Sequence, residues 1–379
     1  MTRNRTLWLA VWGVAMLAGL YGLYLRFTTG HALAGYGSAV PWGLSVALYS
    51  FLSSMSAGLY LISTLPVLFG IQSLEPLRRT ALWGALGTLA GGLTAIGLDL
   101  GQMFRFWEVY TRPNFTSVMA LMVWVYTIFV VVIAFQLRAI ARQNDRSDKN
   151  LTRLGALVAV IMGGGGGALY AVVGSRPFWH SSLLPLLFLV GGMLAGAALL
   201  LFVASLQKSR EGSSLTALAN LVLGLLVLDL IMEWAEFSIG LYGGELAARE
   251  AARLVLFGPY AWAFWGLHLL LGTLVPLALL ALAPQNRTYS TLSGLLVLAT
   301  YLTVRLNIVI PGLAIPVLPG LDRAYIEPGL TYNYAPTSME WLTALFAVAL
   351  AIAVFEIGRG GGTASRDMAP SVSAARKEA

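Results

Sequence analysis

The sequence contains no cysteine and only three histidines among its 379 residues. Without cysteine, the chain forms no disulfide, holds no iron–sulfur cluster through thiolates and has no cysteine nucleophile. A haem held by two histidines is also disfavoured, because among His31, His180 and His268 only His268 lies clearly inside an apolar segment. We therefore expect no haem, iron–sulfur cluster or metal site in this chain. Any electrons that it exchanges must come from a centre in another molecule.

Charged residues are scarce as well. They make up 11% of the chain and apolar residues 58%, whereas soluble domains have roughly 25% charged residues. Long apolar stretches recur along the sequence, which excludes a water-soluble protein and predicts a lipid environment. The net charge of +7 does not indicate nucleic-acid binding, because the basic residues sit in short loops between the apolar stretches.

The apolar stretches are long enough to cross a membrane, which takes roughly 20 residues. Ten segments qualify: 7–25, 41–70, 80–99, 117–137, 154–174, 183–206, 215–241, 258–283, 291–310 and 339–358. The first resembles a secretory signal, but no cleavage site follows it, so we read it as an uncleaved span. We predict an all-α integral membrane protein, with a polytopic domain over residues 1–358 and a disordered cytoplasmic tail over 359–379.

The basic residues also predict the orientation. Ten spans put both termini on one side, and 16 of the 24 Lys and Arg residues fall on that side, against 7 in the opposite loops. Because cytoplasmic loops carry the excess of positive charge, we expect both termini in the cytoplasm of a bacterial cell, with the protein in its cytoplasmic membrane.

A faint internal repeat suggests how the spans are grouped. Met55–Leu61 in the second span matches Met193–Leu199 in the sixth. Spans 2–5 and 6–9 then form two related four-helix bundles, flanked by spans 1 and 10. The fifth span contains an unbroken run of glycines at 163–167, which indicates either a hinge or, as we favour, small-residue packing against a neighbouring helix.

Placing a charged side chain inside lipid is energetically unfavourable, so we expect each charged residue within a span to have a structural or functional role. Asp229, Glu233 and Glu236 are spaced by four and three residues, which places them on one helix face. His268 and Arg305 fall at a similar depth, in the middle and outer half of the membrane. We expect Arg305 to form an ion pair with Asp229 or Glu233. The remaining carboxylates and His268 are candidates for proton transfer.

The loops on the outer side mix aromatic and charged residues in three segments, 98–117, 174–181 and 325–336. Most of these Trp and Tyr residues fit the aromatic belt at a membrane surface. Repeated combinations of Arg, an aromatic residue and an acid or His also suit an aromatic-lined pocket for a ring-shaped amphiphile, beside a docking face for a protein.

Several short stretches carry a family resemblance. They are Val40-Pro-Trp-Gly-Leu44, Ser56-Ala-Gly58, Leu98-Asp-Leu-Gly101, Arg105-Phe-Trp107, Pro113-Asn-Phe-Thr-Ser117, Arg176-Pro-Phe-Trp-His-Ser181, Arg305-Leu-Asn307, Ile310-Pro-Gly312, and Pro336 followed by Glu340. In this order the chain resembles the polysulfide reductase membrane-subunit family (NrfD/PsrC-like), over about residues 37 to 358. It looks closest to the ten-span branch that includes the membrane subunit of uptake hydrogenases.

The resemblance implies a quinone site near the outer face, for menaquinone or ubiquinone. It also implies a ferredoxin-like iron–sulfur partner and a catalytic subunit of molybdopterin or hydrogenase type. The residues in the matching segments that become candidates for the quinone pocket are Asp99, Arg105, Glu108, Asn114, Tyr126 and His180.

Two functions remain open on the sequence alone. The first is a quinone- or quinol-reactive subunit of a respiratory oxidoreductase that exchanges electrons with an iron–sulfur partner on the periplasmic side. The alternative is a secondary transporter that uses the intramembrane carboxylates and Arg305.

Overall fold

The computed structural model describes residues 2–207, 212–243, 245–316, 318, 320–324 and 330–367, and every regular element in them is a helix. Ten helical segments are long and apolar enough to cross a membrane. They are α1 (Thr2–Thr29), α2 (Leu44–Phe69), α3 (Arg78–Asp99), α5 (Val118–Ala141), α6 (Asp145–Ala171), α7 (Leu184–Leu206), α8 (Gly212–Tyr242), the π-helix η3 (Ala263–Leu274) continued by α10 (Val275–Leu282), α11 (Arg287–Ala314) and α13 (Ser338–Asp367). The predicted helical class and the ten spans are confirmed.

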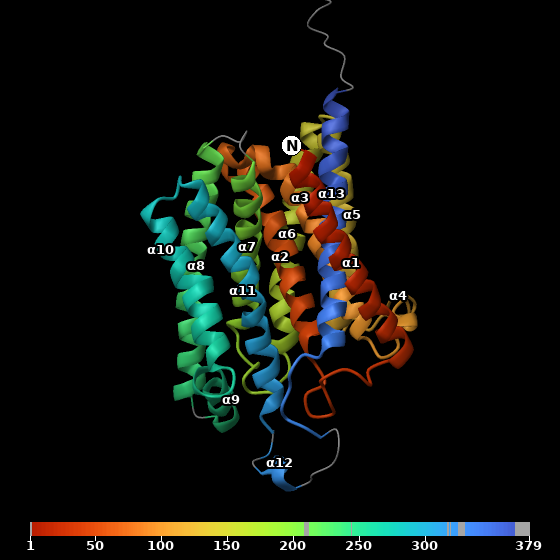
Figure 1. Cartoon of the computed structure of the whole chain (residues 1–379), viewed down its shortest axis with the longest axis vertical. Coiled ribbons are helices and arrows are strands. Elements are labelled where there is room, and N and C mark those ends of the chain that lie inside the picture. Colours follow the sequence, from red (N-terminus) through yellow and green to blue (C-terminus); the bar gives the residue numbers. More distant parts are fainter. Residues whose placement is uncertain are drawn as a thin grey trace, which may run out of the picture.

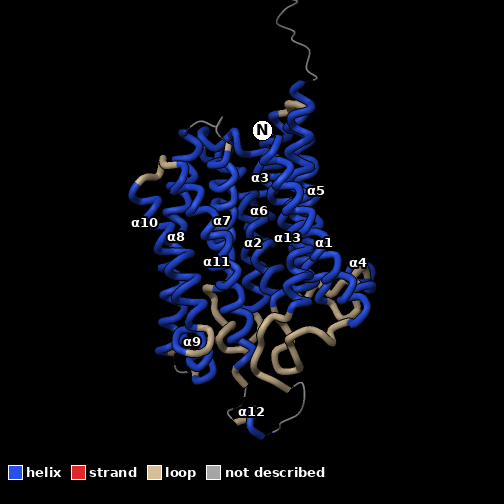
Figure 2. Tube along the Cα trace, in the orientation of Figure 1, coloured by secondary structure: helices blue, strands red, loops and turns tan. Residues whose placement is uncertain are grey.

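The remaining helices are short and lie between the spans. They are η1 (Gln72–Leu77), η2 (Met103–Arg105), α4 (Glu108–Thr111), α9 (Leu246–Phe257) and α12 (Leu321–Ala324). The start of α1 and the end of α13 lie at one end of the molecule, which we call the terminal end; α9 and α12 lie at the opposite, loop end (Figure 1). Most of the long irregular segments gather at the loop end (Figure 2).

The last helix extends beyond the predicted end of the membrane domain. α13 continues to Asp367 instead of stopping at 358, because adding residues to an existing helix costs less than starting one. The predicted division into a membrane domain over 1–358 and a disordered tail over 359–379 stays a prediction. Residues 368–379 lie outside the described residues, as do Lys208 and Arg210 of the charge count and 325–329 of the third aromatic segment.

We group the spans into two sets by their contacts. α2, α3, α5 and α6 contact one another as a first group, and α7, α8, η3 with α10, and α11 as a second. The groups are joined by contacts of α2 with α7 and α11 and of α6 with α7, while α1 packs on α13 and α13 packs on α3. The predicted division into two bundles with flanking spans remains our interpretation of these contacts.

The two groups meet where α2 crosses α7, at the segments of the internal repeat. A Cβ on Gly58 would collide with the backbone of Gly192 and Met193, and one on Gly196 would collide with the backbone of Leu59. Glycine at these positions lets the two helix backbones touch, as small residues do between helices in lipid.

The glycine run in α6 serves packing of the same kind. The helix is unbroken through residues 163–167. A Cβ on Gly167 would meet the backbone of Leu184 and Pro185 at the start of α7, and one on Gly165 would meet Met122 of α5. The run lets α6 approach two neighbours closely, which supports small-residue packing over a hinge.

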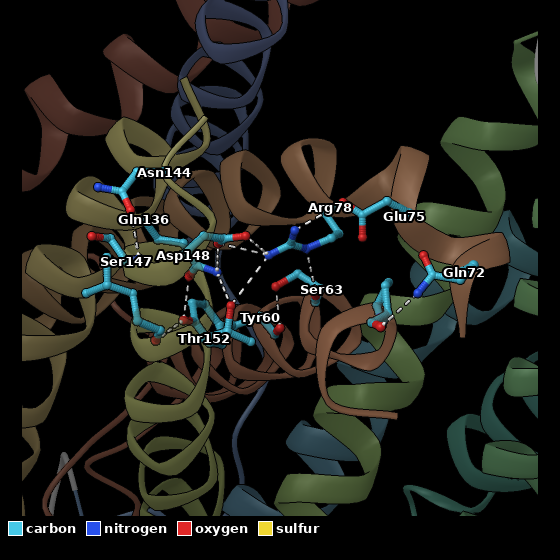
Figure 3. Close-up of polar contacts among 12 residues, drawn as sticks. Tyr60, Ser63, Gln72, Glu75, Arg78, Gln136, Asn144, Ser147, Asp148 and Thr152 are labelled. Atoms are coloured by element: carbon cyan, nitrogen blue, oxygen red, sulfur yellow. Dashed lines mark hydrogen bonds and ion pairs between the residues drawn. The ribbon is translucent and has the colours of Figure 1, made fainter. Parts of the chain in front are cut away.

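A buried polar network ties the first group together at the terminal end (Figure 3). Arg78 of α3 donates to both carboxylate oxygens of Asp148 of α6, at 3.0 and 2.9 Å. Gln136 of α5 donates to Thr152 at 2.8 Å and accepts from the hydroxyl of Tyr60 of α2 at 2.5 Å. Four helices are thus joined through groups that would be costly to leave unpaired.

Candidate functional site

The second group encloses a cavity in the half of the molecule nearer its loop end. Its lining comes from α7, α8, η3, α11 and the segment before α7. It contains the titratable or charged residues Asp229, Glu233, Glu236, His268, Tyr301 and Arg305, together with Asn307 and the aromatic residues Phe178, Phe237 and Phe264. The cavity is narrow, about 40 Å³, which is room for a few water molecules. All five residues that the sequence assigns to charge and proton chemistry are therefore brought together here.

The three carboxylates on α8 each have a different partner. Glu233 Oε2 lies 2.7 Å from His268 Nε2 of η3. Asp229 accepts the hydroxyl of Tyr301 of α11, with distances of 3.2 and 3.1 Å to its two oxygens. Glu236 accepts from Ser181, in the segment before α7, at 2.7 Å. Each carboxylate is thus coupled to a group that can donate a proton.

Arg305 does not form the predicted ion pair with Asp229 or Glu233 within the described residues. Its guanidinium carbon lies 3.8 Å from the ring centroid of Phe188, and its Nη2 donates to Ser54 Oγ of α2 at 3.3 Å. The carboxylates are occupied by Tyr301 and His268, and the guanidinium instead uses the negative face of an aromatic ring. The contact with Ser54 also links this cavity to the first group of helices.

Three buried polar atoms along the cavity have no hydrogen-bond partner among the described residues: His268 Nδ1, Arg305 Nε and Asn307 Nδ2. Their residues are 2%, 1% and 7% exposed. A buried donor or acceptor without a partner costs about 1–3 kcal/mol, so native proteins rarely keep one without water or a ligand. Three such atoms on one cavity mark it as a candidate site for water or a polar ligand.

The helix that carries His268 is itself unusual. η3 is a π-helix of 12 residues, whose wider turn accompanies a bond from Thr273 Oγ1 to the carbonyl of His268 at 3.2 Å. π-helical turns are rare and occur frequently at functional sites. Gly272 lies against Thr300 of α11, so the lack of a side chain there lets η3 approach α11.

Asp99, predicted as a pocket residue, belongs to a different polar cluster at the loop end of α3. Arg26 donates to His31 Nε2 at 2.7 Å, His31 Nδ1 lies 2.5 Å from the Tyr36 hydroxyl, and Tyr36 donates to Asp99 at 3.0 Å. Burial and the neighbouring Arg26 lower the pKa of His31. Burial and the Asp99 carboxylate raise the pKa of Tyr36. This cluster joins α1 to α3 and does not line the cavity.

Nearby, Glu340 at the start of α13 accepts from the Gly35 amide at 2.9 Å and from the Tyr334 hydroxyl at 2.6 Å. Sequence reasoning missed this cluster because Arg26, His31 and Tyr36 read as ordinary loop residues. The available signal was a single histidine close to an arginine at the end of a span.

The other predicted pocket residues do not gather either. Arg105 and Glu108 form an exposed pair, with Arg105 Nε 2.6 Å from Glu108 Oε1, and Arg105 lowers the pKa of Glu108. Asn114 accepts from Thr116 in an exposed turn. Tyr126 is buried inside the first group with its hydroxyl 2.5 Å from that of Tyr49. The loop between α3 and α5 is thus separate from the cavity.

His180 is adjacent to the cavity in sequence but not part of its lining. Its Nδ1 lies 2.7 Å from the carbonyl of Ala171, and the side chain is exposed. The neighbouring residues face inward instead: Phe178 lines the cavity, Trp179 donates to the carbonyl of Ile308 at 2.7 Å, and Ser181 binds Glu236. The segment therefore contributes to the cavity through residues other than His180.

Comparisons with known proteins give relatives over most of the sequence. A family model described as polysulphide reductase, NrfD, matches residues 33–317. The C subunit of selenate reductase from Mesobacillus selenatarsenatis is 30% identical, over 93% of each sequence. An Hdr-like menaquinol oxidoreductase integral membrane subunit of Archaeoglobus fulgidus is 27% identical, over 90% of this protein and 88% of its own length. Protein NrfD of Escherichia coli is 27% identical, over 64% of this protein and 84% of its own length.

Proposed function

The chain belongs to the polysulphide reductase NrfD family of multi-pass membrane subunits of oxidoreductase complexes, and we propose on this basis that it reacts with a quinone or quinol. One relative is named a menaquinol oxidoreductase subunit and another a selenate reductase subunit. Those names favour electron transfer over the secondary transport that the intramembrane charges alone left open.

The observation that carries the proposal is the set of unpartnered donors and acceptors in the second group. A quinone head needs a polar group near each carbonyl and aromatic or apolar walls around its ring. His268 Nδ1 and Asn307 Nδ2 supply polar groups, and Phe178 and Phe264 supply walls. The cavity holds only a few water molecules as it stands, so a quinone head would have to widen it.

A quinone supplies two-electron chemistry, and its reduction takes up two protons. The chain's own part is to hold and move those protons. His268 lines the cavity with Nδ1 unpartnered among the described residues and Nε2 beside Glu233, so it can exchange a proton with the ligand through Nδ1 and with Glu233 through Nε2. Tyr301 and Asp229 form a second such pair, between α11 and α8. Arg305 would stabilise negative charge that develops in the cavity.

Glu236 provides the connection toward water. It is held by Ser181 in the segment before α7, closer to the loop end than Glu233 on the same face of α8. Protons would therefore pass between the cavity and the loop end through Glu233 and Glu236.

The electrons must come from a partner, since the chain has no cysteine to hold a cluster. We propose a ferredoxin-like iron–sulfur subunit docked at the loop end, connected to a catalytic subunit of molybdopterin or hydrogenase type. A surface cavity of about 750 Å³ there is lined by polar and aromatic groups that include Glu245, Glu250, Tyr260 and Arg323. In the orientation that the basic residues favour, this end faces the periplasm of a bacterial cell.

Replacement of His268 tests the site. In the assembled complex, His268→Gln and Asp229→Asn should lower quinone-linked turnover about a hundredfold, because each removes a proton-transfer group. Reduction of an artificial soluble acceptor by the catalytic partner should be unchanged. Steady-state assays with a quinone analogue and with the soluble acceptor measure both.

A quinone pocket at Asp99 and His180, as the sequence predicted, would give the opposite result. If His180→Gln or Asp99→Asn abolishes quinone turnover while His268→Gln leaves it intact, the quinone head binds outside the second group. That result would contradict the proposed position of the quinone site, but it would still agree with a quinone-reactive membrane subunit.

A further inference from the structure

The turn between α5 and α6, at the terminal end, holds a rigid backbone. Gln143 adopts a positive φ of 54°, its amide bonds to the carbonyl of Ile140 at 3.2 Å, and the Asn144 amide bonds to the carbonyl of Ala139 at 3.0 Å. This pair of bonds is the Schellman arrangement that ends a helix firmly. The side chains around the turn are therefore presented in a fixed frame.

A cavity of about 360 Å³ opens beside this turn. Arg138 and Arg142 line it from α5; they are four residues apart and so lie on one helix face. The amides of Asn144 and Asn150 and the hydroxyl of Ser147 line it from the turn and α6, and Phe135 forms its apolar side. Two arginines, two asparagines and a serine thus line one cavity.

Two acids in the first turn of α6, Asp145 and Asp148, lie next to the lining residues in sequence. Asp145 is exposed and forms no hydrogen bond or ion pair within the described part of the chain. Asp148 points toward Arg78 and binds it with both oxygens, as Figure 3 shows. No hydrogen bond or ion pair within the described part of the chain uses the guanidinium of Arg138 or Arg142. The oxygen of Asn144 accepts from the Ser147 amide at 3.0 Å, which leaves its NH₂ directed elsewhere.

The cavity lies at the boundary between charged and apolar surface. Phe135, Leu154 and Leu157 are 58%, 49% and 60% exposed on the α5–α6 face. Because α5 and α6 are long and apolar enough to span a membrane, we expect these side chains to face acyl chains and Arg138 and Arg142 to face the headgroup layer. Basic pockets in this position, beside transmembrane helices, suit acidic lipid headgroups.

We propose that this cavity binds one acidic phospholipid. Its phosphodiester lies between Arg138 and Arg142, which form charge-assisted hydrogen bonds with the anionic oxygens. Asn144, Ser147 and Asn150 bind the glycerol hydroxyls, and the acyl chains run over Phe135 and the exposed leucines of α6. A free phosphate would use the arginines but leave the apolar side of the cavity facing nothing.

The test uses the purified full-length protein in detergent with equimolar phosphatidylglycerol and phosphatidylcholine, read by native mass spectrometry. Phosphatidylglycerol adducts should dominate. Arg138→Gln/Arg142→Gln should lower their occupancy about tenfold or more. The matched control, Arg146→Gln/Lys149→Gln, removes the same charge from the first turns of α6, at two positions that do not line the cavity, and should retain the adduct.

Three outcomes would overturn the proposal. Equal losses in the two double variants would show diffuse attraction to a basic loop. Equal occupancy by the two lipids would show that the headgroup is not recognised. Displacement of phosphatidylglycerol by inorganic phosphate as readily as by phosphatidylglycerol itself would show a free-anion site. Both variants replace exposed side chains, so neither removes a contact on which the fold depends.

Discussion

Arg305 is a buried cation whose nearest partners are an aromatic ring and a hydroxyl. Its side chain is 1% exposed, it stacks on Phe188, and it stands near Asp229 without pairing with it. Gly191 leaves room for it, because a Cβ there would meet the hydroxyl of Tyr301 and, at 3.2 Å, Arg305 Nη2. The position demands a flat, delocalised cation, and lysine does not offer the same planar contact.

Arg305→Lys should therefore destabilise the protein although the charge is kept. The lost stacking in a desolvated site is worth about 2 kcal/mol, which corresponds to a fall of a few degrees in the thermal midpoint. Thermal unfolding of the purified subunit measures it. An unchanged midpoint for Arg305→Lys, together with a lower one for Arg305→Gln, would show that only the charge matters.

His31 gives the loop end a dependence on pH. Its pKa lies below the ordinary 6.5 because of burial and of Arg26, with Leu100 and Glu340 acting in the opposite direction. The folded chain therefore keeps His31 neutral, and between the lowered pKa and about 6.5 the unfolded chain binds more protons. Stability from this cluster is full above about 6.5 and is lost as pH falls through that window.

Acidification from about pH 7.5 to about pH 5 should accordingly loosen the contact of α1 with α3. The protection factors of amides 26–36, which compare exchange with the intrinsic rate at each pH, should fall over this range, and His31→Gln should remove the acid-dependent part. An equal fall in the His31→Gln variant would assign the effect to Asp99 or Glu340, the carboxylates that share the cluster.

The site was predictable where residue spacing fixes geometry. Asp229, Glu233 and Glu236 share a face because a helix repeats every 3.6 residues, and depth along the spans placed His268 and Arg305 with them. Spacing does not say which neighbouring helix a face meets. That is why the contacts of Arg305, the hydroxyl of Tyr301 and the inward turn of Ser181 required the structure.

At the scale of elements, the crossing of α2 and α7 depends on glycine. The two helices touch through Gly58, Gly192 and Gly196, where any side chain would overlap backbone atoms. A helix pushed outward here would separate the first group from the second and break the contact between Arg305 and Ser54.

Gly192→Leu should therefore abolish stable expression, whereas Gly224→Leu should be tolerated. A Cβ at Gly224 meets nothing within 4 Å, so it serves as a matched control in another span, α8. Fluorescence-detected size exclusion of the detergent extract distinguishes a folded peak from aggregate. Equal peaks for the two variants would mean that the crossing is more adaptable than its geometry indicates.

At the scale of the whole molecule, the ten spans follow from the sequence because each must satisfy its own backbone in lipid and be apolar over its length. The boundaries were close for most spans; α13 ran on past its apolar stretch, where polar composition no longer marks the end of a helix. Grouping was harder to predict. In lipid, an apolar helix surface does not specify which neighbouring helix it packs against. The small residues that allow close helix packing are visible in the sequence only as a weak repeat.

Topology connects the whole fold to the proposed function, because the partner must meet the loop end. Gln285 lies between α10 and α11, and Asp322 lies in α12, on opposite sides of the span α11. With 16 of 24 basic residues on the side of the termini, a green fluorescent protein fused after Gln285 should fluoresce, and alkaline phosphatase fused after Asp322 should be active. The reverse pattern would keep the ten spans but place the iron–sulfur partner in the cytoplasm. Signals from the same side for both fusions would show that α11 does not cross the membrane. The cavity could then not be enclosed by α7, α8, η3 and α11 within the membrane.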